Sequence, residues 1–247
     1  MKTVLITGCS SGFGLETARF FLGRGWQVVA TMRTPCEDVL PRSEHLRVLP
    51  LDVTDAASIR DCVAAAGPID ALVNNAGIGL LGALEGITLE RVREIFETNT
   101  FGTMAMTQAV LPQFRERRGG VVVNVTSSVT LKSLPLLSVY TASKAAVNAF
   151  TESLALELAP FGVRAALVLP GRAPATRFGE NARSRMDGSI PEPYAELAGA
   201  VFAEWAQQPA DAVTHAADVA EAVWRAVNEP ASPMRLPAGA DAVALAA

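Results

Sequence analysis

Short runs of apolar, mostly β-branched residues alternate along this chain with longer stretches in which apolar positions recur every three or four residues. The short runs predict strands, and the longer stretches predict amphipathic helices. Strands are expected at residues 3–7, 27–31, 46–51, 69–73, 121–126 and 163–169, with an edge strand at 234–237. Helices are expected at residues 12–22, 55–66, 88–117, 139–158 and 218–228.

The alternation of these elements predicts the fold class. Strands and helices that follow one another in turn are typical of a parallel sheet with helices on both faces. The predicted strands 121–126 and 163–169 are almost continuously apolar, as expected where both faces of a strand are covered. The sequence therefore predicts an α/β fold, a doubly wound parallel sheet that forms a single domain over residues 1–247.

The pattern changes after Pro170-Gly171. Residues 172–212 contain prolines, scattered charges and aromatic residues, and only one helix, at 194–205, is expected among them. Long irregular segments in compact domains are often lids or binding loops. We expect these residues, named the lid segment from here on, to cover a substrate site.

Composition narrows the classes of partner. Half of the 247 residues are hydrophobic, and 21 basic against 25 acidic residues give a formal net charge of −4. This balance gives no support for nucleic-acid binding, and no run of about 20 apolar residues predicts a membrane span. The cysteines Cys9, Cys36 and Cys62 lack metal-ligand spacing, so we expect no metal site and a location in the reducing cytoplasm.

A glycine-rich turn, Thr7-Gly-Cys-Ser-Ser-Gly-Phe-Gly14, joins the first predicted strand to the first helix. Glycines let backbone N–H groups approach a phosphate closely, and the start of a helix adds a favourable partial charge. A tight turn without a ligand could have the same composition, but its place between a first strand and a helix favours a dinucleotide site. The predicted cofactor contacts are Gly8, Ser10, Ser11, Gly12, Phe13 and Gly14.

The ends of the next strands indicate which dinucleotide is bound. No acidic residue follows the second strand to hold a ribose 2′-hydroxyl, and Arg33 could pair with a 2′-phosphate, which favours NADP(H). Arg33 could also be a solvated surface residue, so that use of NAD(H) stays open. Asp52 is either a cap or a contact to the adenine ring. Further cofactor contacts are expected from Val53, Asn75, Ala76 and Gly77.

Tyr140 and Lys144 are four residues apart at the start of a predicted helix and therefore share one face. A free tyrosine has a pKa near 10, too high for easy proton transfer at neutral pH. An ammonium beside it, together with a positive nicotinamide ring, would lower that pKa. Ser127 ends a strand and can reach the same crevice. A tyrosine and a lysine at this spacing are often a surface pair, but the chain order of these motifs favours catalysis.

These motifs resemble those of the short-chain dehydrogenase/reductase family. In order they are Thr7-Gly-x-x-x-Gly12-x-Gly14, Asn74-Asn-Ala-Gly77, Asn99, Asn124-Val-Thr-Ser127, Tyr140-x-x-x-Lys144 and Pro170-Gly171. The resemblance covers residues 1–175 and resumes from residue 214. It implies a Rossmann-like sheet of about seven parallel strands in the order 3-2-1-4-5-6-7, and a homodimer or homotetramer.

The resemblance also implies roles for individual residues. Tyr140 would be the general acid in reduction and the general base in oxidation, and Ser127 would hydrogen-bond the substrate oxygen. Lys144 would bind the nicotinamide ribose and tune Tyr140, and Asn99 would hold a water that links Lys144 to solvent. Both the count from Asn124 and the count to Tyr140 select Ser127 as the catalytic serine, with the adjacent Ser128 as the alternative.

The family pattern is less closely followed beyond the sixth strand. Pro170, Gly171, Tyr140 and Lys144 are expected to contact the cofactor, but Thr176 stands one place later than the usual spacing. The contact that this threonine often makes with the carboxamide is therefore left open.

Apolar residues in the loop at 129–139 and in the lid segment predict a hydrophobic ketone or secondary alcohol as the substrate. They are Leu131, Leu134, Leu136, Leu137 and Val139 in the loop, and Phe178, Tyr194, Phe202 and Trp205 in the lid segment. The same side chains could instead pack in the core or at a subunit interface. The sequence thus predicts an NADP(H)-dependent oxidoreductase, with a catalytically silent NADP(H)-sensing regulator of the same fold as the alternative.

Overall fold

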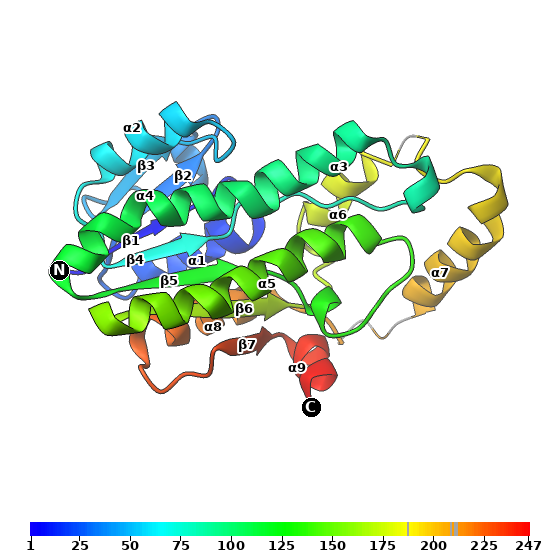
Figure 1. The fold of residues 1–247 in the computed structure, drawn as a ribbon. Coiled ribbons are helices and arrows are strands. Elements are labelled where there is room, and N and C mark those ends of the chain that lie inside the picture. Colours follow the sequence, from blue (N-terminus) through cyan, green and yellow to red (C-terminus); the bar gives the residue numbers. More distant parts are fainter. Residues whose placement is uncertain (187, 208, 210–211) are drawn as a thin grey trace.

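The computed structural model describes residues 1–186, 188–207, 209 and 212–247. In these residues, seven parallel strands form one sheet in the order β3-β2-β1-β4-β5-β6-β7 (Figure 1). The strands are β1 (Thr3–Ile6), β2 (Gln27–Met32), β3 (Leu46–Pro50), β4 (Ala71–Asn74), β5 (Gly120–Val125), β6 (Val163–Pro170) and β7 (Arg235–Ala238). The predicted α/β fold class and strand order are confirmed, and the predicted edge strand is β7.

Helices cover both faces of this sheet (Figure 1). The helices are α1 (Gly12–Leu22), α2 (Ala56–Ala66), α3 (Leu89–Phe96), α4 (Gly102–Arg117), α5 (Ser138–Leu158), α6 (Phe178–Arg183), α7 (Ala195–Gln207), α8 (Ala216–Asn228) and α9 (Ala240–Ala246). Helices α1 and α8 pack against each other on one face. Helices α2, α4 and α5 bury their apolar side chains on the opposite face.

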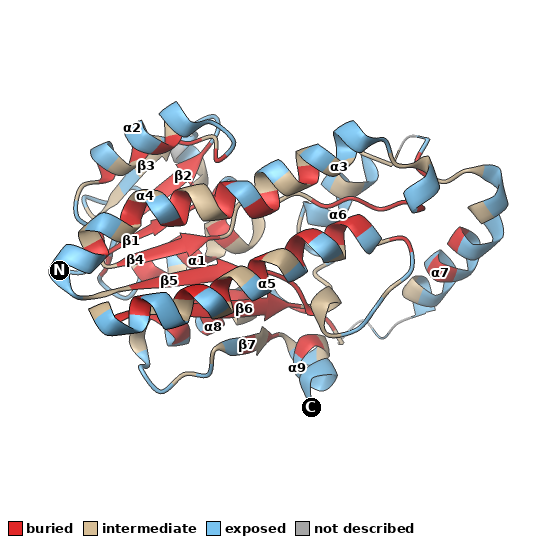
Figure 2. Ribbon diagram, in the orientation of Figure 1, coloured by how far each residue is buried: buried red, intermediate tan, exposed pale blue. Residues whose placement is uncertain are grey.

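Alternate side chains of each central strand enter two separate cores. Val121 and Val123 of β5 pack among the residues of α1 and α8, whereas Val122 between them packs with α2, α4 and α5. Because successive side chains point to opposite faces of a sheet, a strand covered on both sides has to be apolar throughout. Figure 2 shows the consequence: the central strands are buried, the edge strands β3 and β7 less so, and the outer faces of the helices are exposed.

Local sequence explains where several helices begin. The carboxylate of Asp55 accepts a hydrogen bond of 2.8 Å from the N–H of Ala57, so α2 starts directly after this N-cap. Thr88 accepts one of 3.3 Å from the N–H of Arg91 and is the N-cap of α3.

The predicted helix at 88–117 is not regular throughout. A π-helical turn, η3 (Glu97–Phe101), separates α3 from α4 and contains Asn99. A π-helical turn inserts an extra residue into the helix and is frequent at functional sites. The prediction of one continuous helix over residues 88–117 is therefore wrong at this turn.

The lid segment differs from the prediction of one helix at 194–205. The structure has α7 near those residues, and also α6, which was not expected. Six residues are too few for the recurrence of apolar positions that indicates a helix. Helix α9 was missed as well, because its run of alanines has little polar contrast. Residues 187, 208, 210 and 211 of the lid segment lie outside the described residues.

Candidate active site

The glycine turn between β1 and α1 has the backbone geometry that its composition suggests. Gly8 and Gly12 have φ angles of +75° and +58°, in the left-handed region that favours glycine. A Cβ on Gly14 would lie 2.3 Å from the carbonyl oxygen of Gly8, so the turn tolerates no side chain there. The turn is therefore compact, and its backbone is open to a ligand at the start of α1.

The start of α1 fits a phosphate. Ser11 occupies the N-cap with extended backbone, but its side chain makes no capping hydrogen bond, and the first turn of α1 contains no acidic residue. The N–H groups of such a turn lack intrahelical partners and carry the positive end of the helix dipole. Thr176 reaches this place from the lid segment, and its Cβ lies 3.6 Å from the position of a Cβ on Gly12.

Thr7, which was not predicted as a site residue, connects the glycine turn to the end of β4. The hydroxyl of Thr7 accepts hydrogen bonds from the N–H groups of Asn75 (3.0 Å) and Ala76 (2.9 Å). In return, the amide of Asn75 donates to the carbonyl oxygens of Thr7 (2.9 Å) and Gly8 (3.2 Å). The side-chain amide of Asn75 is therefore engaged in supporting the turn. The predicted contact of Asn75 with the cofactor would be made by its backbone.

Arg33 and Asp52 lie at the carboxyl ends of β2 and β3. Arg33 is exposed, and its charge contributes to lowering the pKa of Asp52. The larger causes of that lowered pKa are two hydrogen bonds from Thr54, of 2.7 Å from its hydroxyl and 2.9 Å from its N–H. The carboxylate of Asp52 therefore caps a local turn, and its predicted contact with the adenine ring stays a prediction. The neighbouring Val53 is buried against Gly102 at the start of α4.

Ser127, Tyr140 and Lys144 are brought together at the carboxyl end of β5. Ser127 follows β5, and helix α5 presents Tyr140 and Lys144 one turn apart. Tyr140 is hydrogen-bonded to the side chain of Ser127, and all three residues are buried. The Lys144 ammonium donates a hydrogen bond of 3.0 Å to the carbonyl oxygen of Val125. Its other two N–H groups are available to a ligand on chemical grounds.

Burial shifts the pKa values of both titratable residues. It raises the pKa of Tyr140 to about 12, and the hydrogen bond with Ser127 offsets only part of that rise. It lowers the pKa of Lys144 to about 8. In the protein without cofactor the net shift of the Tyr140 pKa is upward, because desolvation of the phenolate outweighs the hydrogen bond with Ser127. The lowering expected from Lys144 together with the nicotinamide ring stays a prediction.

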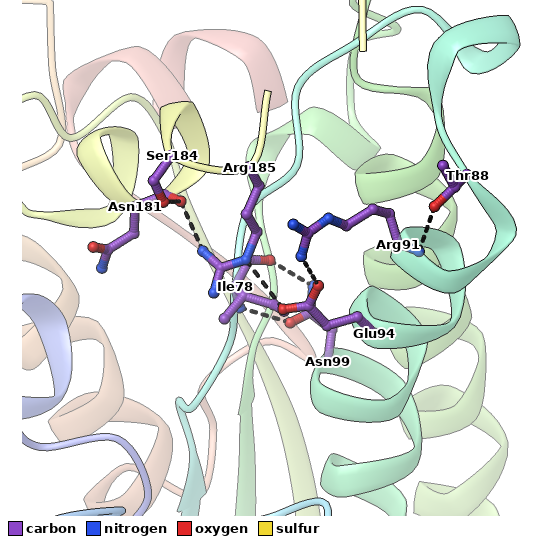
Figure 3. A network of polar contacts seen from close by, with 8 residues as sticks. All are labelled: Ile78, Thr88, Arg91, Glu94, Asn99, Asn181, Ser184 and Arg185. Atoms are coloured by element: carbon purple, nitrogen blue, oxygen red, sulfur yellow. Dashed lines mark hydrogen bonds and ion pairs between the residues drawn. The ribbon is translucent and has the colours of Figure 1, made fainter. Parts of the chain in front are cut away.

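Asn99 lies in the π-helical turn beside these residues. Its amide donates to the carbonyl oxygen of Ile78 (2.9 Å) and to the hydroxyl of Ser143 (3.1 Å), and its side-chain oxygen accepts from the N–H of Ile78 (2.8 Å), as Figure 3 shows for Ile78. A Cβ on Gly77 would lie 3.3 Å from Lys144 Nζ and 3.2 Å from Asn99 Oδ1. Gly77 thus leaves the space between Lys144 and Asn99 open, where the predicted water would lie.

Beneath the site, a buried polar network connects the two central strands to α4 and α5. The amide of Asn74 donates to Asn124 Oδ1 (2.8 Å) and to the hydroxyl of Thr107 (3.0 Å). The amide of Asn124 donates to the hydroxyl of Thr151 (2.7 Å). Asparagine at the same position of two neighbouring parallel strands was a signal that could have predicted this network.

The lid segment lies against three glycines of the stretch from Gly79 to Gly86. A Cβ on Gly79 would be 2.9 Å from Phe178 and Ala182, one on Gly82 would be 2.6 Å from Ser189, and one on Gly86 would be 2.6 Å from Pro191. Each glycine therefore makes room for a lid residue.

Polar contacts hold the lid segment in the same place. Glu94 of α3 accepts hydrogen bonds from Arg185 (3.2 Å) and from Arg91 (2.6 Å) (Figure 3). The hydroxyl of Tyr194 donates to a carboxylate oxygen of Glu85 at 2.9 Å. These contacts join the lid segment to α3 and to the turn before it.

The predicted pocket residues divide between two environments. The ring of Phe178 lies 5.6 Å from the ring of Tyr140, centroid to centroid, so this aromatic residue does cover the tyrosine. Leu136, Leu137, Tyr194 and Trp205 pack together in a small apolar core beneath α7, and Val139 packs with Leu80 and Ile95. For these residues the packing alternative is correct. Phe202 contacts Trp205 and stays 37% exposed.

Comparison with known proteins relates this arrangement to one family. The sequence profile described as short chain dehydrogenase matches residues 2–187. A 3-ketodihydrosphingosine reductase of Bacteroides thetaiotaomicron is 42% identical over 174 residues, 69% of this chain and 63% of the relative. Retinol dehydrogenase 8 of Bos taurus is 42% identical over 184 residues, 69% of this chain and 58% of the relative. The matched region thus spans less than two thirds of either relative.

A solved structure extends the similarity to nearly the whole chain. The closed form of a serine dehydrogenase complexed with NADP+ superposes with a TM-score of 0.81 at 29% identity, covering 95% of this chain and 93% of the other. None of the helices in the described part of the chain has the length and apolar character that crossing a bilayer requires.

Proposed function

The chain belongs to the short-chain dehydrogenase family, and on that premise we propose that it is an oxidoreductase that transfers a hydride between NADP(H) and an apolar ketone or secondary alcohol. The observation that carries the proposal is the buried group of Ser127, Tyr140 and Lys144 at the same edge of the sheet as the glycine turn. In open α/β sheets, ligands bind in the crevice outside the carboxyl ends of the strands.

The cofactor assignment rests on the fit of the residues present. Gly8 and Gly12 open the backbone at the start of α1 to a pyrophosphate, and Lys144 would bind the nicotinamide ribose through its free N–H groups. When bound, the nicotinamide supplies or accepts the hydride. Arg33 is exposed at the end of β2, where it would pair with a 2′-phosphate, and the serine dehydrogenase noted above was solved with NADP+.

Tyr140 would transfer the proton. In reduction, it donates its phenolic proton to the oxygen of the carbonyl as the carbon receives the hydride, and in oxidation it takes that proton back. Ser127 would donate a hydrogen bond to the same oxygen and stabilise the developing negative charge. In the protein without cofactor, a pKa raised to about 12 keeps the phenol protonated at neutral pH. The positive charges of Lys144 and the bound nicotinamide would lower that pKa toward the range that proton transfer requires. Asn99 would hold the water that returns protons to Lys144.

The substrate class follows from the lid segment. Phe178 covers Tyr140 with an aromatic ring, so a substrate bound at Tyr140 would contact an apolar surface. The names of the two relatives, a 3-ketodihydrosphingosine reductase and a retinol dehydrogenase, denote ketone and alcohol chemistry on largely hydrocarbon molecules. We infer that the lid segment and the sheet form one domain that encloses the substrate.

The proposal is tested by following the absorbance of NADPH, and then of NADH, at 340 nm with a panel of apolar, charged and sugar-like carbonyl compounds. The wild type is expected to oxidise NADPH with the apolar ketones. Tyr140→Phe removes the proton donor and should reduce kcat by at least about a hundredfold.

The chain offers a matched control, since its other tyrosine, Tyr194, lies in the lid segment with its hydroxyl on Glu85. Tyr194→Phe removes the same atom outside the site and should keep most of the activity. Binding of NADPH without turnover across the panel would instead favour a regulatory protein that senses the cofactor. Activity confined to charged or sugar-like carbonyls would refute the apolar substrate class.

A further inference from the structure

Asp241, in the first turn of α9, contacts both ends of the lid segment. Its Oδ2 accepts a hydrogen bond of 2.6 Å from the N–H of Arg172, where the lid segment begins. Its Oδ1 accepts one of 2.8 Å from the hydroxyl of Thr214, just beyond the end of the lid segment. One carboxylate thus joins residues that are 42 positions apart along the chain, from 172 to 214.

Further hydrogen bonds close the base of the lid segment. The N–H of Thr214 donates to the carbonyl oxygen of Arg172 (2.8 Å), and the N–H of Gly171 donates to the hydroxyl of Thr214 (2.8 Å). That hydroxyl has a second possible acceptor at 2.8 Å, the carbonyl oxygen of Ala238 at the end of β7. Thr214 is only 1% exposed, so these bonds are shielded from water.

Two glycines leave the space that this arrangement occupies. A Cβ on Gly171 would lie 2.2 Å from the carboxylate of Asp241. Gly239 has a φ of +93°, and a Cβ there would lie 2.1 Å from the hydroxyl of Thr214. The carboxylate of Asp241 and the hydroxyl of Thr214 therefore occupy the space that a side chain at position 171 or 239 would need. Position 171 belongs to the Pro170-Gly171 turn.

We propose that Asp241 is a positioning residue that clasps both ends of the lid segment to the Pro170–Arg172 turn. Under the proposed function, on which this inference rests, that turn contacts the nicotinamide half of the cofactor. The clasp then couples cofactor binding to closure of the lid segment. A turn that the cofactor fixes in place holds the lid segment closed, and a loosened clasp weakens both cofactor binding and closure.

The clasp depends on hydrogen bonds and not on charge, which makes the conservative variant informative. In Asp241→Asn, the amide oxygen can accept from Arg172, and the NH2 group can donate to the hydroxyl of Thr214, whose proton then goes to Ala238. Every partner stays satisfied. Asp241→Ala leaves the N–H of Arg172 and the hydroxyl of Thr214 without this acceptor.

Limited trypsin digestion measures the clasp without any need for turnover, because Arg177 and Arg183 are exposed in the lid segment. Cleavage at these residues is followed in the full chain with and without NADPH, together with the NADPH Kd from the cofactor's fluorescence. Asp241→Ala should be cleaved faster without NADPH, lose the protection that NADPH gives, and bind NADPH about tenfold more weakly. Asp241→Asn should stay within about twofold of the wild type.

The control is Asp218→Ala. Asp218 caps α8 by accepting a hydrogen bond of 2.7 Å from the N–H of His215, next to Thr214, but no hydrogen bond joins it to the turn among the described residues. This variant loses a helix cap and should keep both the protection and the Kd of the wild type. Should Asp241→Ala fail to fold, Thr214→Val and Thr214→Ser repeat the comparison.

Wild-type protection and Kd in Asp241→Ala would overturn the clasp, and so would equal losses in Asp241→Ala and Asp241→Asn. The failure of the proposed function has a different signature. A wild type that binds NADPH and protects its lid segment, yet reduces no carbonyl compound, would support the clasp and refute the oxidoreductase.

Discussion

At the scale of single residues, the site contains a charge that the fold accommodates at a cost in stability. Lys144 is buried, and within the described part of the chain its ammonium has one hydrogen-bond acceptor, the carbonyl oxygen of Val125. Burial lowers its pKa from 10.5 to about 8, which corresponds to roughly 3 kcal/mol of lost stability at neutral pH. Residues that destabilise a protein in this way are typical of functional sites.

Lys144→Met is therefore expected to abolish turnover without destabilising the fold at pH 7. The variant loses the buried charge but leaves Val125 without its donor, which costs about 1–3 kcal/mol. The net change in the free energy of unfolding should lie between zero and a gain of about 2 kcal/mol. Urea denaturation measures it.

The lowered pKa of Lys144 also predicts how the stability of the fold changes with pH. Because the folded pKa of Lys144 lies below its unfolded value, its contribution to stability is complete above pH 10.5 and is lost as the pH falls through about 8. Wild-type stability should rise between pH 8 and 10, and this rise should be smaller in Lys144→Met. Above pH 10, Tyr140 acts in the opposite direction, since its folded pKa of about 12 is raised. An unchanged slope in the variant would contradict the prediction.

Under the proposed function, Arg33 would select NADPH over NADH, which is a further prediction at the scale of single residues. Arg33→Ala should raise the KM for NADPH about tenfold and leave the KM for NADH unchanged, because only NADPH carries a 2′-phosphate. Steady-state kinetics with both cofactors measures the ratio. Arg42→Ala removes an exposed arginine from the same loop and serves as the control. A parallel rise for both cofactors would show that Arg33 does not read the phosphate.

At the scale of elements, the helices and turns of the lid segment dock on three glycines between residues 79 and 86. Gly79, Gly82 and Gly86 each leave room for a lid residue, and Ser189 adds a hydrogen bond of 2.9 Å from its hydroxyl to the carbonyl oxygen of Leu81. Such docking depends on close packing, in which even one added methyl group is felt.

Gly82→Ala should displace the lid segment, because the new Cβ would lie 2.6 Å from the side chain of Ser189 and 2.8 Å from its carbonyl oxygen. We expect the KM for apolar ketones to rise about fivefold or more, while the Kd for NADPH stays near that of the wild type. Gly199→Ala is the matched control, since a Cβ there meets no atom within 4 Å in α7. Equal effects of the two substitutions would refute docking at Gly82.

At the scale of the whole molecule, exposed apolar side chains occur on the helices that cover one face of the sheet. Phe101 at the end of the π-helical turn is 53% exposed, and Leu156 of α5 is 78% exposed. The homo-oligomer expected from the family resemblance would bury this layer.

The double substitution Phe101→Asp and Leu156→Asp should therefore lower the molar mass measured by light scattering after gel filtration, because two charges would enter the subunit contact. Leu245→Asp places a charge on another exposed apolar residue, in α9, and should leave the mass unchanged. A double variant with the mass of the wild type would exclude this layer as the interface.

The sequence by itself determined the strands, most helices and their order, because these follow from periodic patterns and from turn residues that act locally. It also indicated that Ser127, Tyr140 and Lys144 lie near the glycine turn, since parallel strands present their carboxyl ends at one edge. Helices α6 and α9 escaped prediction, because one is too short and the other too uniform in composition to show a period.

Only the tertiary structure decided what depends on burial and on contacts between distant residues. The raised pKa of Tyr140 and the lowered pKa of Lys144 are consequences of desolvation, which no spacing along the chain reveals. Asp241 and Arg172 are 69 positions apart, and their hydrogen bond exists only because β6 and β7 end side by side. Local sequence patterns specify helices and strands, whereas tertiary packing brings together the distant side chains that form the site.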